Sequence, residues 1–309
     1  MCARNGSGLS PRDIRCMNTE AVALVSRFLN LAPTAIDAEM IASLVEDVGL
    51  CEERAYAECL GAICGLDTAG ADKLFFRNYF LPMVRQCDVD AFRSDRYRKA
   101  VGAFDARDGA WRLGEGRLEA YEAFVCDDFL TLPDGRMIPQ LGFFRESFTY
   151  PAVYENGREW MTLLPNEQVT MREPVSSAFG KVLTYGLGLG YFAFLASEKE
   201  NVSSVTVVEA DLSAERLFRR FILPKFPHKE KLRIIHADAF EYAKGEMWRE
   251  EYDFVFADIW HDAGDGREAY LRLRETERLS PQTKFAYWIE KTIQCYLDES
   301  LWKKAEDVN

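Results

Sequence analysis

The chain has 309 residues, of which 48% are hydrophobic, enough to bury a sizeable core in one large or two modest domains. Its net charge of −12 and its isoelectric point near 5.0 exclude a protein that holds nucleic-acid backbones through a basic surface. No apolar run approaches the ~20 residues that span a bilayer, and the polar start lacks the pattern of a signal peptide. A cytoplasmic protein with no membrane or nucleic-acid partner is therefore expected.

The eight cysteines and three histidines show no metal-binding spacing. No CxxC pair occurs, and most cysteines lie among apolar residues in segments with a helical pattern. Reduced, buried thiols are therefore expected, and no metal site is predicted.

The N-terminal part of the chain has the apolar spacing of helices. The predicted helices are Thr19–Leu31, a helix from Pro33 that stops at Gly49, Glu52–Cys64, Lys73–Arg85 and Arg117–Phe129. The turn-rich stretch Leu132–Gln140 follows and is interpreted as a connector. Residues 1–140 are thus predicted to form an all-helical N-terminal domain, and residues 141–309 an α/β domain.

Asn156-Gly157 lies between two extended runs, which is typical of a hairpin with a type I′ turn. Val153-Tyr154 and Trp160-Met161 are the expected cross-strand neighbours. This entry hairpin precedes the α/β part of the chain.

From Lys181 onward, short apolar strands alternate with helices. The predicted strands contain the segments VLTY, SVTVVEAD, LRIIHADAF and YDFVFADIW. Such alternation predicts a Rossmann-like parallel sheet with right-handed crossovers. Ligands of these sheets bind at the carboxyl ends of the strands, so the residues that end each strand are the informative ones.

Polar or glycine residues stand at each of these strand ends. The first strand runs into a glycine turn, where glycine lets a ligand approach the backbone closely. The second ends in Glu209, whose carboxylate can accept hydrogen bonds from a ribose diol. The third ends in Asp238-Ala239, where a carboxylate can accept from an adenine amine and a backbone amide can donate to the ring. The fourth ends at Asp258. The glycines of the turn are Gly186, Gly188 and Gly190.

In this order of residues, the stretch from about Lys181 to Leu279 resembles the class I S-adenosylmethionine-dependent methyltransferases, and among them the spermidine-synthase-like branch. The resemblance implies that the cofactor is S-adenosyl-L-methionine or S-adenosylhomocysteine. It implies that the glycine turn holds the methionine part, Glu209 the ribose, and Asp238 with Ala239 the adenine. Tyr185 and Asp258 complete the expected cofactor site. The chain departs from the family pattern at Thr184, where methyltransferases usually have an acid.

A second interpretation is a nicotinamide dinucleotide site. Gly188-Leu189-Gly190-Tyr191-Phe192-Ala193 satisfies the GxGxxG/A pattern if the first strand is extended by two residues. That register places Gly186 inside the strand and leaves Asp238 without a role. A third interpretation is a fold that binds no nucleoside.

The segment after Asp258, DIWHDAGDG, is where related enzymes face their acceptor. His261 is a candidate general base, because imidazole exchanges protons near neutral pH. Asp258 is a candidate for positioning an amine. Asp262 or Asp265 is expected to cap a helix over Arg267–Arg278.

Phe285–Ile289 is either a fifth strand or part of a helix that continues through Leu297. A full methyltransferase sheet needs two further strands, so the domain is predicted to be C-terminally shortened, with self-association through its open sheet edge or the helical domain. The predicted function is methyl transfer to a small-molecule acceptor. An aminopropyltransferase acting on polyamines, and a non-catalytic nucleoside-binding or assembly protein, are the alternatives.

Overall fold

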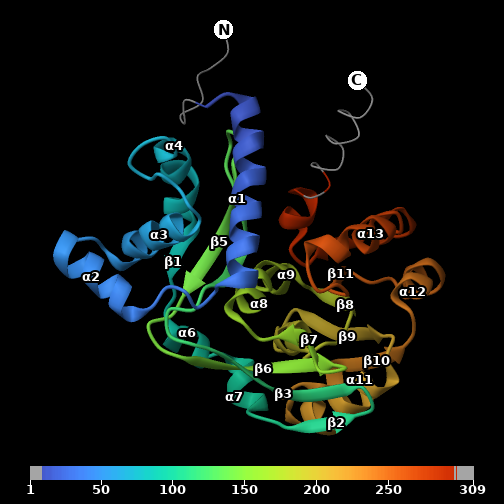
Figure 1. Cartoon of the computed structure of the whole chain (residues 1–309). Helices are drawn as coiled ribbons and strands as arrows, with labels where there is room; N and C mark the ends of the chain where they lie inside the picture. Colours follow the sequence, from blue (N-terminus) through green and yellow to red (C-terminus); the bar gives the residue numbers. More distant parts are fainter. Residues whose placement is uncertain (1–8, 296, 298–309) are drawn as a thin grey trace. The chain divides into compact units, whose positions relative to one another are not determined.

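The computed structural model describes residues 9–295 and residue 297, and the chain folds into two compact units (Figure 1). The first unit contains the residues up to Phe92 together with Arg117–Thr149. The second contains Arg93–Gly116 and the residues from Tyr150 onward. Each unit has its own hydrophobic core. The border predicted at residue 140 lies within strand β5 (Met137–Phe143) of the first unit.

The first hundred residues are mainly helical, as predicted. The helices are α1 (Pro11–Leu31), α2 (Ala38–Val48), α3 (Glu52–Ile63), α4 (Lys73–Phe75), a π-helical turn (Phe76–Phe80), α5 (Leu81–Met83) and α6 (Val89–Arg93). Local signals fix their ends. Ser10 and Asp13 form a capping box at the start of α1, and Gly49, with φ of 76°, ends α2 in the left-handed conformation.

The first unit also contains a three-stranded sheet, so this part of the chain is not all-helical. Strands β1 (Val84–Gln86) and β4 (Phe124–Thr131) flank β5. The helix predicted over Arg117–Phe129 is wrong, because most of β4 falls there. The connector predicted at Leu132–Gln140 contains the turn between β4 and β5: the Leu132 amide donates to Arg136 O at 2.8 Å.

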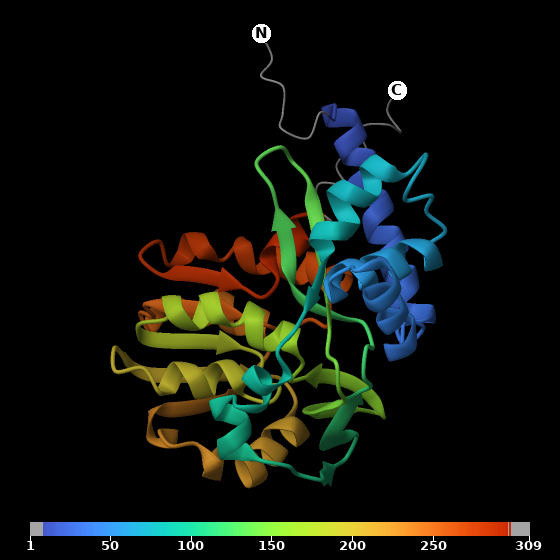
Figure 2. The ribbon, with the colours of Figure 1, turned by 90° about the vertical axis from the view of Figure 1, so that its left-hand side faces the viewer.

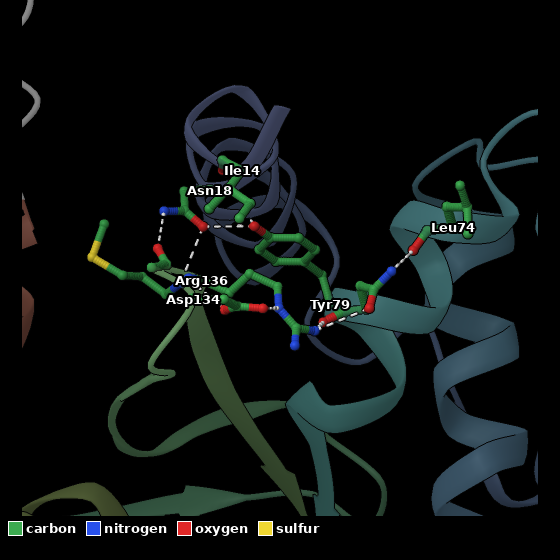
Figure 3. A network of polar contacts seen from close by, with 9 residues as sticks. Ile14, Asn18, Leu74, Tyr79, Asp134 and Arg136 are labelled. Carbon is green, nitrogen blue, oxygen red and sulfur yellow. Dashed lines mark hydrogen bonds and ion pairs between the residues drawn. The ribbon is translucent and has the colours of Figure 1, made fainter. Parts of the chain in front are cut away.

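Asn18 of α1 joins this helix to the β4–β5 turn (Figure 3). Its side-chain nitrogen donates to Gly135 O at 3.1 Å, and its oxygen accepts from the Tyr79 hydroxyl at 2.7 Å and from the Met137 amide at 3.0 Å. The Arg136–Asp134 ion pair, at 2.9 Å, lies in the same turn, with both side chains largely buried. One buried amide thus satisfies groups from three elements.

Asn18→Ala is expected to lower the free energy of unfolding of the first unit by about 1–3 kcal/mol, since it removes all three hydrogen bonds from a buried site. Urea denaturation measures the change. Asn30→Ala is the matched control, because Asn30 is exposed on the same helix and, among the described residues, its side chain bonds to Ser26 O alone. Equal stabilities for the two variants would contradict this role of Asn18.

The second unit contains most of a four-stranded sheet in the order β2-β3-β6-β7. Its strands are β2 (Ala106–Asp108), β3 (Trp111–Leu118), β6 (Phe148–Glu155) and β7 (Arg158–Thr162). The predicted hairpin at Asn156-Gly157 is confirmed, with φ of 51° and 80° at the two turn residues. Val153 pairs with Met161 as expected, whereas a register shift places Tyr154 opposite Glu159.

The rest of the second unit is a Rossmann-like layer of helices on a parallel sheet, as predicted. The strands are β8 (Gly180–Tyr185), β9 (Val202–Glu209), β10 (Leu232–His236), β11 (Phe254–Ala257) and β12 (Lys284–Tyr287). The α-helices are α7 (Arg96–Val101), α8 (Pro165–Thr170), α9 (Arg172–Ser177), α10 (Tyr191–Ser197), α11 (Leu212–Leu217), α12 (Ala239–Gly245) and α13 (Ala263–Arg274).

The strand order β10-β9-β8-β11-β12, with every pair parallel, determines where a ligand site can form (Figures 1 and 2). The chain first moves outward from β8 through β9 to β10 and then returns to the other side of β8 with β11. The order therefore reverses between β8 and β11, and ligands of such sheets bind beside this switch point. Gly186 follows β8 and Asp258 follows β11, so both lie at this place.

Strand β12 resolves the open interpretation of Phe285–Ile289 in favour of a strand. Residues 290–295 are helical. The predicted shortening of the domain concerns the chain beyond residue 297, which lies outside the described residues.

Candidate functional site

The glycine turn after β8 adopts a conformation that other residues rarely adopt. Gly186, Gly188 and Gly190 have φ of 91°, 48° and 73°. A Cβ on Gly186 would lie 2.0 Å from Asp258 O. The turns after β8 and β11 can therefore be in contact here only because residue 186 has no side chain. A Cβ on Gly190 would lie 2.4 Å from the ring of Phe218. Gly190 therefore faces the core.

A cavity of about 330 Å³ lies over the carboxyl ends of the strands. The predicted site residues that line it are Gly186, Gly188, Glu209, Asp238, Ala239, Asp258 and His261. Tyr185 and Gly190 are not part of its described lining. The Tyr185 side chain is buried, and its backbone oxygen accepts from the Asp258 amide at 3.0 Å. Tyr185 and Gly190 therefore take part in the packing of the strand and the turn and not in the cavity lining.

Glu209 ends β9 beside the glycine turn. Its Oε2 accepts a hydrogen bond from the Leu187 amide at 3.1 Å, and its Oε1 accepts one from the Asp211 amide at 2.8 Å. Burial raises the pKa of Glu209, and the backbone amides partly oppose this shift. Each oxygen has a further lone pair, so the carboxylate can still accept from a ligand.

Asp238 follows strand β10, which ends at His236, and is the N-cap residue of α12. Its Oδ1 caps this helix, accepting from the Phe240 and Glu241 amides at 2.9 and 3.0 Å. The side chain is exposed, and its other oxygen makes no hydrogen bond to the described residues. The capping bonds hold the carboxylate in place while leaving Oδ2 for a ligand.

Asp258 shares the cavity wall with Glu167, a residue that the sequence did not single out. Burial raises the pKa of Asp258 from its ordinary value of 3.8 to about 7. Burial, followed by the charge of Asp258, raises the pKa of Glu167 well above its usual range. Within the described part of the chain neither carboxyl has a side-chain hydrogen bond or ion pair. The buried Glu167 and the half-buried Asp258 therefore form an acid pair that favours a proton or a cation.

The acid pair predicts a pH-dependent stability. The folded state holds the Asp258 proton more tightly than the unfolded chain does, so the second unit loses stability as the pH rises from about 4 to about 7. Asp258→Asn is expected to flatten this dependence and to raise the melting temperature by a few degrees near pH 8. For a unit of this size, 1 kcal/mol corresponds to roughly 2–4 °C.

Thermal melts from about pH 5 to about pH 8 test this expectation. Glu200→Gln, at an exposed position of the same unit, is the control and should leave the profile unchanged. An Asp258→Asn profile as steep as that of the unsubstituted protein would contradict the assignment.

Aromatic rings form much of the remaining wall. Trp160 packs edge-on against His261, with ring centroids 4.1 Å apart, and its centroid lies 5.7 Å from that of Trp111. His261 Nδ1 lies 3.2 Å from Asp265 Oδ2. Trp288 completes the ring set, and its indole nitrogen donates to Thr170 Oγ1 at 2.9 Å. These rings offer flat apolar faces that also attract cations.

Asp265 and Asp262 cap α13, as predicted. They form a capping box, in which Asp262 Oδ1 accepts from the Asp265 amide and Asp265 Oδ1 accepts from the Asp262 amide. The helix begins at Ala263, four residues earlier than expected. Asp265 thus both caps the helix and orients His261.

The charge of the cavity wall is one-sided. Its acidic residues are Glu155, Glu167, Glu209, Asp211, Asp238 and Asp258. No lysine or arginine is among the described lining residues. A pocket lined by one sign of charge concentrates ligands of the opposite sign, so this cavity suits a cation.

Across the described ranges, no group of three or more histidine, cysteine or acidic side chains is placed to hold a metal ion. Within the same ranges, no helix is long and apolar enough to cross a membrane.

Comparison with known proteins gives structural similarity only. No protein-family model matches the chain, and no curated protein matches its sequence. Among solved structures, spermidine synthase from Thermotoga maritima aligns with 60% of this chain and 55% of its own, at 15% identity and a TM-score of 0.34. The human methyltransferase 10 domain containing protein aligns with 44% of this chain and 68% of its own, at 13% identity and a TM-score of 0.31.

Precorrin 8W decarboxylase from Methanobacterium thermoautotrophicum is also similar, over 38% of this chain and 56% of its own, at 14% identity and a TM-score of 0.28. The chain thus spans little more than half of the spermidine synthase and of the decarboxylase. Its own strand order shows a Rossmann-like α/β fold with the cavity at the switch point.

Proposed function

We propose that the cavity binds S-adenosylmethionine and that the protein transfers the methyl group to a small acceptor carrying an amine. One observation carries the proposal: the glycine turn, Glu209 and Asp238, at the ends of three successive strands, line a single cavity. The glycine turn permits close approach of a ligand, and both carboxylates keep acceptor capacity beyond their bonds to backbone amides, which together support an adenosyl ligand.

Each part of an adenosyl ligand has a matching group in this cavity. Glu209 would accept from the ribose hydroxyls, and Asp238 Oδ2 from the exocyclic amine of adenine. The Ala239 amide is in the first turn of α12, where amides lack intrahelical partners, and would donate to a ring nitrogen. Phe240 also lines the cavity and would stack on the base; the Arg272 guanidinium lies 3.6 Å from its ring centroid. The cavity volume lies in the range of ligand pockets.

The acid pair and His261 supply the acceptor side. A sulfonium donor provides an electrophilic carbon and a neutral thioether as leaving group. The acceptor nitrogen forms the new C–N bond as the C–S bond breaks, and the electron pair of that bond stays on sulfur. Asp258, with its pKa near 7, would hold the amine in line and take the proton that it loses. Trp160 and Trp288 would shield the reacting groups from water.

Aminopropyl transfer is the second candidate, and the charge of the wall favours it. The decarboxylated donor lacks the carboxylate that this acidic wall would repel. A diamine acceptor would be held by the Glu167–Asp258 pair and by the tryptophan faces. The same displacement applies, with an aminopropyl carbon in place of the methyl carbon.

Incubation with each donor and a panel of amines, read by mass spectrometry, tests both candidates. Methyl transfer yields S-adenosylhomocysteine with a methylated amine, and aminopropyl transfer yields methylthioadenosine with an extended amine. Asp258→Asn is expected to reduce either reaction at least about 100-fold, as for loss of a general base. Donor binding without either product would support the non-catalytic alternative and contradict the proposed transfer.

A further inference from the structure

Met161 of β7 lies directly on the glycine turn. Its Sδ accepts a hydrogen bond from the Leu189 amide at 3.2 Å. A Cβ on Gly188 would lie 2.1 Å from the same sulfur, so the thioether rests on the bare Cα of this glycine. Met161, a side chain of the protein itself, therefore occupies the space beside Gly188 that the missing Cβ leaves open.

The position of Met161 matters if an adenosyl donor binds as proposed above, and the inference rests on that proposal. Glu209 Oε2 is bonded to the Leu187 amide, so a ribose held by Glu209 lies beside the start of the turn. The chain on the donor sulfur then extends along the turn toward Gly188 and Leu189. Met161 lines the same cavity at this end.

The wall offers a donor carboxylate no cationic partner among the described lining residues, which include no lysine or arginine. Besides the side-chain N–H groups of its tryptophans and of His261, it offers the backbone amides of the turn. The Leu189 amide is one of these backbone donors, and it already donates its hydrogen bond to Met161 Sδ. A thioether is a weak acceptor, whereas a carboxylate makes stronger, charge-assisted bonds to amides.

We propose that Met161 is a specificity-determining residue that occupies the subsite for the donor's α-carboxylate. A donor that carries this carboxylate must displace the thioether from the Leu189 amide, whereas a decarboxylated donor leaves it in place. The displacement is mechanically simple, because methionine has three rotatable side-chain bonds and, in the described sheet, β7 is an edge strand that pairs with β6. Met161 thus disfavours S-adenosylmethionine relative to its decarboxylated form.

Calorimetric titration of the full chain with each donor tests the proposal. In Met161→Ala, the ratio of the two dissociation constants is expected to shift toward S-adenosylmethionine by about tenfold, the value of one charge-assisted hydrogen bond. Met161→Leu keeps the bulk and removes the acceptor, so a smaller shift in the same direction is expected. Met247→Ala removes a buried methionine outside the described cavity wall and should leave the ratio unchanged.

The ratio separates this inference from the function it rests on. An unchanged ratio in Met161→Ala, or a shift toward the decarboxylated donor, would overturn the role of Met161 and show that it only packs against the turn. Failure of the unsubstituted protein to bind either donor would instead overturn the proposed function.

Discussion

Gly186→Ala is expected to destabilise the second unit by about 3 kcal/mol or more and to abolish ligand binding. The new Cβ would lie 2.0 Å from Asp258 O, and the residue would keep a φ of 91°. The carbonyl cannot retreat without disturbing the β8–β11 ladder, since the Asp258 amide is bonded to Tyr185 O at 3.0 Å. Relief of the clash therefore separates the two turns that form the floor of the cavity.

Denaturant unfolding measures the loss, and Gly245→Ala is the matched control. Gly245 ends α12 in the same unit, and a Cβ there would meet nothing within 4 Å. This control is expected to be neutral or slightly stabilising, because alanine is the better helix former. If Gly186→Ala were as stable as Gly245→Ala, the contact between the two turns would be wrong.

Glu209→Gln is expected to weaken binding of S-adenosylmethionine about 100-fold and, because the Asp211 amide loses its acceptor, to lower the free energy of unfolding by about 1–3 kcal/mol. The glutamine keeps the shape of the side chain and one acceptor for the Leu187 amide. It replaces the other carboxylate oxygen by a donor nitrogen, which cannot accept from a ribose hydroxyl and faces the Asp211 amide. Hydrogen bonds to charged groups contribute roughly 1.5–3 kcal/mol each, which sets the expected size.

Titration calorimetry gives the dissociation constants, and Glu200→Gln removes a charge at an exposed position of the same unit as the control. Adenine alone should bind both proteins equally, because its contacts are assigned to Asp238 and Ala239. An unchanged affinity for S-adenosylmethionine would show that Glu209 does not bind the ribose.

Local chemistry made several features predictable from the sequence. The Asn156-Gly157 turn requires positive φ at both residues, and few dipeptides allow it. The position of Glu209 and Asp238 in one cavity followed from chain order alone, since the carboxyl ends of parallel strands meet at one edge. The fold and the candidate cofactor side of the cavity were thus accessible without coordinates.

Other features depend on packing between distant segments. Glu167 precedes the glycine turn on a short helix, and no spacing connects it with Asp258; only burial against the same cavity brings the two acids together. The sequence does not distinguish Gly190 from the other glycines of the turn, Gly186 and Gly188, yet Gly190 packs against the Phe218 ring. The sequence predicts a helix where β4 lies, because the inward and outward residues of this strand do not alternate cleanly after the register shifts near Asp127.

Titration of the protein with S-adenosylmethionine by calorimetry tests the central claim most directly. One saturable site with a micromolar dissociation constant, competed by S-adenosylhomocysteine and weakened in Glu209→Gln, is the predicted result. No detectable heat with S-adenosylmethionine, its decarboxylated form or S-adenosylhomocysteine, from a protein that melts cooperatively, would contradict the adenosyl site at the β8–β11 switch point.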